Sequence, residues 1–140
     1  MGCQTREIDN HINNYPYEKE LVDYLEAVHQ IDLKGESWVA LIPIPNCSGC
    51  TADILKICIE NPSMKPVILN SNAKDMLYYQ KLIEQLPHAK RDSTDEYFNY
   101  DTGIYGATVV RFDDKKLEFF RELNTGNAPE VGDYIHRTIE

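Results

Sequence analysis

The chain has 140 residues, of which 42% are hydrophobic and 26% are charged. This length and balance predict one globular domain with a core of its own and argue against a disordered polar chain. The formal net charge of −9 argues against nucleic acid or an anionic membrane surface as a partner. No apolar stretch of the sequence reaches the length that is needed to cross a bilayer.

The N-terminus, Met1-Gly2-Cys3-Gln4, has two interpretations. Gly2-Cys3 resembles the end of a bacterial lipobox, whose cysteine becomes the lipidated first residue of the mature protein. A lipid on Cys3 would then be the only membrane contact, and the chain would be a lipoprotein of the bacterial periplasm or cell envelope. The other interpretation is an ordinary disordered terminus on a cytoplasmic protein. Under both, residues 1–15 are expected to be a flexible tether and residues 16–140 the folded domain.

Helix and strand patterns alternate along the rest of the chain. Pro16 suits a first helical position, and apolar residues recur three and four positions apart in the helical segments. Short apolar runs predict the strands, and the last two flank Asp113-Asp114-Lys115-Lys116, which is typical of a hairpin turn. In chain order we predict a helix (17–30), a strand (38–45), a helix (51–60), a strand (65–69), a helix (76–86), two hairpin strands (107–112 and 117–123) and a helix (129–139). This order predicts an α/β fold with a mixed central sheet, a C-terminal antiparallel hairpin and helices on both faces.

The segment 88–105 has no clear hydrophobic period and is predicted to be a long surface loop. Its acids are expected to lie on a solvated face, and they are Asp92, Asp95, Glu96 and Asp101. Its aromatic residues are Tyr97, Phe98, Tyr100 and Tyr105. They either pin the loop to the core or form a binding surface.

The motif Cys47-Ser48-Gly49-Cys50 lies between the strand predicted over 38–45 and the helix predicted over 51–60. A cysteine at this junction lies at a helix N-terminus, where unpaired N–H groups and the macrodipole favour an anion. The pKa of Cys47 is therefore expected to be lowered, which makes its thiolate a nucleophile. Cys50, one turn further on, can attack the mixed disulfide that Cys47 forms. Cys58 on the same helix is predicted to be a small buried hydrophobe.

The order of elements, with C-x-x-C opening the helix after a central strand, resembles the thioredoxin-like superfamily. The similarity is greatest to small bacterial envelope thiol–disulfide oxidoreductases of the thioredoxin and TlpA-like kind. The resemblance implies a three-layer sandwich that serves cell redox homeostasis. It implies that Cys47 is the exposed nucleophile and Cys50 the buried resolving thiol of a redox-active disulfide. Protein thiols or disulfides would be the partners, with no other cofactor and no metal.

Three positions depart from the pattern of that family. Asn46 stands where an aromatic residue usually precedes the first cysteine, and it can instead cap the helix. The buried carboxylate that helps proton transfer in thioredoxin would fall near Leu41, and this chain has no acidic residue between Ser37 and Cys50. The cis-proline that faces the dithiol in the family is replaced by Ala107, just before Thr108. The resemblance therefore implies a substrate-binding edge formed by Asn46, Ala107 and Thr108.

Two other functions remain open. A C-x-x-C that opens a helix after a strand also marks small copper(I) modules, in which two thiolates hold a soft ion. Structural zinc needs four ligands, and the histidines that could supply them are dispersed: His11, His29, His88 and His136. The other alternative is a non-enzymatic thioredoxin-fold binding domain with a structural disulfide.

Overall fold

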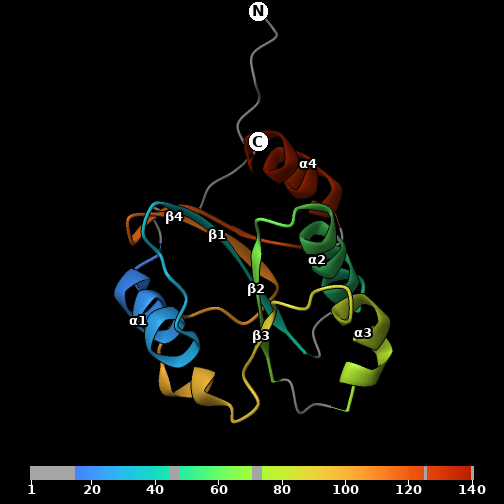
Figure 1. The fold of residues 1–140 in the computed structure, drawn as a ribbon, viewed down its shortest axis with the longest axis horizontal. Helices are drawn as coiled ribbons and strands as arrows, with labels where there is room; N and C mark the ends of the chain where they lie inside the picture. Colours follow the sequence, from blue (N-terminus) through green and yellow to red (C-terminus); the bar gives the residue numbers. More distant parts are fainter. Residues whose placement is uncertain (1–14, 45–47, 71–73, 125, 140) are drawn as a thin grey trace, which may run out of the picture.

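The computed structural model describes residues 15–44, 48–70, 74–124 and 126–139 (Figure 1). Residues 1–14 of the predicted tether, which include Cys3 and His11, lie outside these ranges. Asn46 and Cys47 also lie outside them. The elements in chain order are α1 (Glu18–His29), β1 (Glu36–Pro43), α2 (Ser48–Glu60), β2 (Lys65–Leu69), α3 (Met76–Ile83), β3 (Lys90–Arg91), the 3-10 helix η2 (Glu96–Asn99), β4 (Thr108–Asp113), β5 (Lys116–Glu122) and α4 (Ala128–Ile139). Within the described ranges, none of these helices combines the length and apolar character that a membrane span requires.

The strands form one mixed sheet in the order β3-β2-β1-β4-β5. β1 pairs in parallel with β2, and β2 pairs in parallel with β3. β4 runs antiparallel to β1 and forms the C-terminal hairpin with β5. The predicted α/β fold with a mixed sheet is therefore confirmed, and so is its antiparallel hairpin.

Helices cover both faces of the sheet and make three layers, with α1 on one side and α2, α3 and α4 on the other (Figure 1). The steps from β1 to β2 and from β2 to β3 run in the same direction across the sheet. Because crossover connections are almost always right-handed, these two steps place α2 and α3 on the same face.

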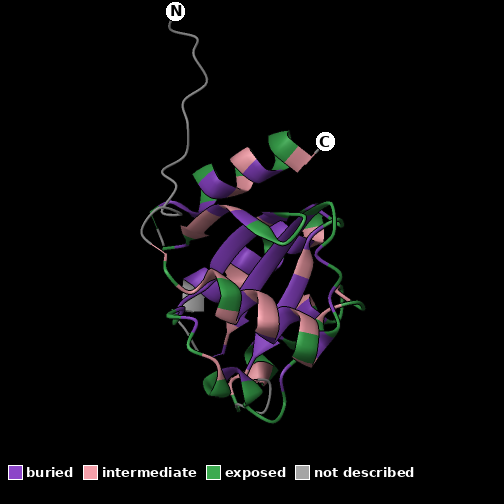
Figure 2. Cartoon of the chain, turned by 90° about the vertical axis from the view of Figure 1, so that its left-hand side faces the viewer, coloured by how far each residue is buried: buried purple, intermediate pink, exposed green. Residues whose placement is uncertain are grey.

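The central strand β1 is buried on both faces, as its continuous apolar sequence predicts. Trp38, Ala40 and Ile42 belong to the core cluster on the α2 side. Val39 and Leu41 belong to the cluster on the α1 side. This alternation follows the period of two of a strand. Figure 2 shows that the buried residues follow the strands and the inner sides of the helices.

The predicted surface loop over 88–105 is only partly a loop. Lys90 and Arg91 pair with Val67 and Ile68 as the edge strand β3, and η2 follows. Both β3 residues are exposed, so the strand has no apolar alternation that a sequence pattern could reveal. Elements of this length are set by contacts with distant residues rather than by local periodicity.

Asp92 is the centre of a buried polar network, which corrects the prediction that it lies on a solvated face. Its side chain is only 3% exposed. One carboxylate oxygen accepts hydrogen bonds from the Tyr24 hydroxyl and the Tyr97 amide, both at 2.7 Å, and the other accepts from the Glu96 amide at 3.0 Å. The Tyr24 hydroxyl in turn lies 2.9 Å from Nε2 of buried His29. Since the Tyr24 proton is given to Asp92, His29 donates here through Nε2–H. The network joins α1 to the start of η2.

We expect the chain to lose stability at mildly acidic pH through His29. Burial lowers the pKa of His29 and Lys90 acts in the same direction, although Asp92 opposes them. The unfolded chain therefore takes up a proton near pH ~6.5, whereas folded His29 does so only at lower pH. The free energy of unfolding falls as the pH drops below this value, because the unfolded state binds more protons. Chemical denaturation at about pH 7.5 and about pH 5.5 should show a smaller fall for His29→Gln than for wild type.

The control for this prediction is His88→Gln, because His88 is exposed. This variant should show the same pH dependence as wild type. Equal losses of stability in wild type and His29→Gln would contradict the assignment to His29.

Candidate functional site

The C-x-x-C motif lies at the carboxyl end of the central strand. β1 ends at Pro43, and α2 begins at Ser48. Cys50 is in the first turn of α2, and its side chain is 4% exposed. The sulfur of Cys50 takes part in a disulfide bond. Cys47 and Asn46, the other two predicted site residues of this segment, lie outside the described residues.

The second cysteine of α2, Cys58, is a free and fully buried thiol. Burial raises the pKa of Cys58 to about 12, so almost none of it is thiolate at neutral pH. Cys58 belongs to the same buried core cluster as Cys50. The prediction that Cys58 acts as a small hydrophobe is confirmed, and α2 therefore carries one sulfur in a disulfide and one inert thiol.

Ala107 and Thr108 lie at the same end of the sheet as the motif, because Thr108 pairs with Leu41 near the end of β1. The side chain of Ala107 is fully buried in the core cluster that also contains Cys50. Its carbonyl oxygen accepts a hydrogen bond of 2.8 Å from the amide of Leu123. Thr108 is the next residue of an extended chain, so its side chain turns to the opposite face. Its hydroxyl donates to the Gly106 carbonyl at 2.8 Å.

Asn70 joins the ends of the two parallel strands and was not predicted as a site residue. It follows β2 directly and has a φ of 55°, in the left-handed region that asparagine tolerates better than most residues. Its side-chain amide donates a hydrogen bond of 2.7 Å to the Ile44 carbonyl. Ile44 is the last described residue before the motif, so Asn70 holds the chain where it leaves β1. An asparagine immediately after an apolar strand was the available signal in the sequence.

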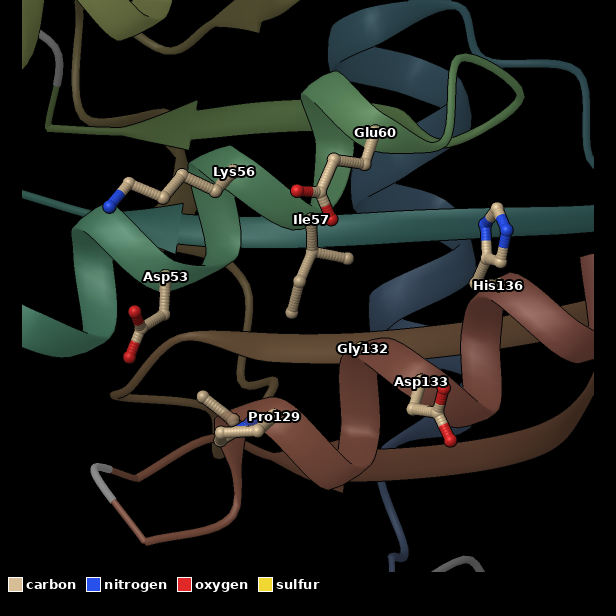
Figure 3. A pocket seen from close by; sticks show the side chains of 9 residues that line it. Asp53, Lys56, Ile57, Glu60, Pro129, Gly132, Asp133 and His136 are labelled. Atoms are coloured by element: carbon tan, nitrogen blue, oxygen red, sulfur yellow. The ribbon is translucent and has the colours of Figure 1, made fainter.

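A groove of about 550 Å³ runs between α2 and α4 (Figure 3). Ile57 points from α2 toward Gly132 of α4, where an added Cβ would lie only 3.2 Å from Cγ1 of Ile57. The absence of a side chain at Gly132 thus lets the two helices approach closely. The acids and bases that line the groove are Asp53, Lys56, Glu60 and Asp133, together with His136.

The charged groups of this groove are not arranged as a metal centre. Asp133 lies 3.4 Å from Nε of Arg137, and Nδ1 of His136 lies 3.2 Å from the side-chain oxygen of Asn61. Across the described part of the chain, no three His, Cys, Asp or Glu side chains are grouped so that they could hold a metal ion. The groove begins at Asp53, three residues after Cys50, and is an open charged surface beside the motif helix.

The aromatic residues of the 88–105 segment divide between the two predicted roles. The ring centre of Tyr24 lies 5.1 Å from the ring centre of Tyr97 and 5.4 Å from that of Tyr100. These two rings pin the segment to the core, as one interpretation predicts. Phe98 and Tyr105 are 70% and 79% exposed, as the other interpretation requires.

No family model, curated protein or solved structure matches this chain. The candidate site is therefore defined by the chain's own residues. These are Cys50 in the first turn of α2, Asn70 at the end of β2, and Ala107 at the start of the hairpin. All three lie at the end of the sheet where β1 and β2 finish.

Proposed function

We propose that the chain is a thioredoxin-like thiol–disulfide oxidoreductase whose redox pair is Cys47 and Cys50. The observation that carries this proposal is the state and position of Cys50. Its sulfur is disulfide-bonded and buried in the first turn of a helix that follows the central strand. A buried second sulfur suits the resolving role, since it is shielded from outside thiols and disulfides.

The arrangement of strands and helices around the motif supports a thioredoxin-like assignment. β1 is central, the motif helix α2 packs on one face, and Ala107, just before the antiparallel hairpin, is buried in the same core cluster as Cys50. The helix N-terminus favours a thiolate at Cys47. The side chain of Asn70 holds the chain where it leaves β1 through its hydrogen bond to the Ile44 carbonyl.

The exchange has two steps, and each step forms one sulfur–sulfur bond and breaks another. The thiolate of Cys47 attacks one sulfur of a substrate disulfide, the substrate S–S bond breaks, and the other substrate sulfur leaves as a thiolate. Cys50 then gives up its proton, and its thiolate attacks the sulfur of Cys47, so that the bond between Cys47 and the substrate breaks and the second substrate sulfur leaves as a thiolate. Two electrons pass to the substrate, the Cys47–Cys50 disulfide forms, and the two released substrate thiolates take up protons from solvent. The reverse sequence oxidises a substrate dithiol.

The experiment that tests the proposal compares redox and metal chemistry in one preparation. We expect the protein to catalyse the reduction of insulin by dithiothreitol and to show a single intramolecular disulfide between Cys47 and Cys50 after oxidation. Peptide mapping by mass spectrometry identifies the two cysteines. Competition with a chromogenic chelator measures the affinity of the reduced protein for Cu(I) and Zn(II).

Catalysed insulin reduction with weak metal binding would support the oxidoreductase. Tight stoichiometric binding of Cu(I) or Zn(II) without catalysis would contradict it and favour a soft-metal module. A Cys47–Cys50 disulfide that forms but catalyses nothing would also contradict it, in favour of a binding domain with a structural disulfide.

A further inference from the structure

A second feature of the same end of the molecule is a hollow of about 280 Å³ between η2 and the chain that leads into β4. Phe98 and Tyr105 line it, although their rings are largely exposed to solvent. Exposed apolar surface that is gathered in one place often marks a binding site, and these two rings line the same hollow. Asp101 also lines the hollow, so it combines aromatic surface with a carboxylate.

The backbone around the hollow is held in place by internal bonds. The hydroxyl of Tyr97 donates to the Ile104 carbonyl and also lies within hydrogen-bond distance of the Thr102 hydroxyl. The Tyr15 hydroxyl donates to the Thr102 carbonyl at 2.6 Å. Gly103 has a φ of +67°, and an added Cβ there would lie 2.7 Å from the ring of Tyr17. The hollow is therefore preformed, which reduces the entropy lost when a ligand binds.

The electrostatic character of the hollow is acidic. The amide of Asp101 donates to the Glu20 carboxylate at 3.1 Å, so a second acid lies next to the first. Among the described residues, the ion pairs involve neither Asp101 nor Glu20. An aromatic ring face attracts a cation, and a nearby carboxylate adds to the attraction. The planar guanidinium of arginine suits both groups, because it stacks on rings and pairs with carboxylates.

We propose that this hollow binds an arginine side chain of the protein whose disulfide the chain exchanges. The proposal rests on the proposed function, and it adds a substrate class: disulfide proteins with an arginine close in sequence to the reacting cysteine. Tyr105 lies two residues before Ala107, and two residues of extended chain span at most about 7 Å. Ala107 shares a core cluster with Cys50 at this end of the sheet, so an extended substrate segment whose cysteine reaches the motif can place a nearby side chain in the hollow.

The test uses two disulfide peptides that differ only in having arginine or citrulline three residues from the cysteine. Citrulline has the shape of arginine without its charge. We expect the wild-type chain to prefer the arginine peptide in kcat/KM by about two- to fivefold, the range given by an exposed cation–π contact. Tyr105→Ala, Phe98→Ala and Asp101→Asn should each lower this preference.

The matched controls are Tyr78→Ala and Glu84→Gln. Tyr78 is an equally exposed aromatic residue on α3, Glu84 is an exposed acid, and neither lines the hollow. Both controls should keep the wild-type preference. A second readout is independent of exchange: a blocked arginine peptide without cysteine should shift the amide signals of Gly103 and Tyr105 in ¹H–¹⁵N NMR spectra, and the citrulline peptide should not.

These readouts separate the two proposals. Shifts at Gly103 and Tyr105 without disulfide exchange by any variant would support the arginine site and contradict the proposed function. Disulfide exchange with equal kcat/KM for both peptides and no NMR shift would overturn the arginine site alone. Equal shifts by the arginine and citrulline peptides would also overturn it, because binding would then not depend on charge.

Discussion

Replacing Cys47 with serine is expected to abolish disulfide exchange, with a loss in rate of about a thousandfold or more. A serine hydroxyl forms no thiolate and cannot attack a substrate disulfide. Cys50, the other sulfur of the motif, is only 4% exposed and should not take over the attack on a substrate disulfide. Cys58, the other thiol on α2, is fully buried, and burial raises its pKa to about 12. The measurement is the rate of insulin reduction by dithiothreitol.

Two further variants sharpen this prediction. Cys50→Ser should leave the first attack intact and accumulate a mixed disulfide with the substrate, visible as a dithiothreitol-sensitive band on a non-reducing gel. Cys58→Ala is the matched control and should keep most of the wild-type rate. Preserved activity in Cys47→Ser, or loss of activity confined to Cys58→Ala, would contradict the assignment of the nucleophile.

The largest effect on stability is expected from Asp92→Ala, with a loss of about 3–5 kcal/mol in the free energy of unfolding. The substitution leaves three buried donors without their acceptor: the Tyr24 hydroxyl and the amides of Glu96 and Tyr97. Each unsatisfied buried donor costs about 1–3 kcal/mol. Asp92→Asn should cost less than Asp92→Ala, because its amide oxygen can still accept from the Tyr24 hydroxyl and the Tyr97 amide, which share one carboxylate oxygen in the wild type. Urea denaturation gives the comparison.

Glu84→Ala is the control for this series, since Glu84 is an exposed acid at the end of α3. It should change the free energy of unfolding by less than about 0.5 kcal/mol. A loss for Asp92→Ala no larger than that of the control would show that the buried network does not stabilise the fold. A loss of disulfide exchange in folded Asp92→Ala is not expected, because the network lies on the α1 side of the sheet.

The sequence predicted those elements whose apolar pattern is long enough to show a period. The strand predicted over 65–69 coincides with β2, and the hairpin, α1 and α4 lie within two residues of their predicted bounds. The helix predicted over 76–86 ends earlier, at Ile83, although turns continue to Leu86. Period and turn residues are local properties, so they can be recognised in a single sequence.

The features that the sequence did not predict depend on distant partners. Asp92 is buried because Tyr24, 68 residues earlier, donates to it, and nothing near Asp92 in the sequence indicates this. The edge strand β3 exists because β2 offers it a neighbour. Asn70 contributes to the candidate site by donating a hydrogen bond to the carbonyl of Ile44, 26 residues earlier. The C-x-x-C motif is visible in the sequence because both of its cysteines are close together, whereas the residues around them come from separate parts of the chain.

The pairing of β1 with β4 has a consequence for the order of folding. It joins residues 36–41 to residues 108–113, so one side of the central strand is completed only by the last third of the chain. Contacts between such distant segments form late, because closing a long loop is entropically unfavourable. β1, α2 and β2 are contiguous and can associate earlier. Until β4 arrives, the core cluster that buries Cys50 lacks Ala107 and Val109, so the cysteine is less fully covered. A nascent chain is therefore most open to incorrect disulfides at the motif before its C-terminal hairpin has been synthesised.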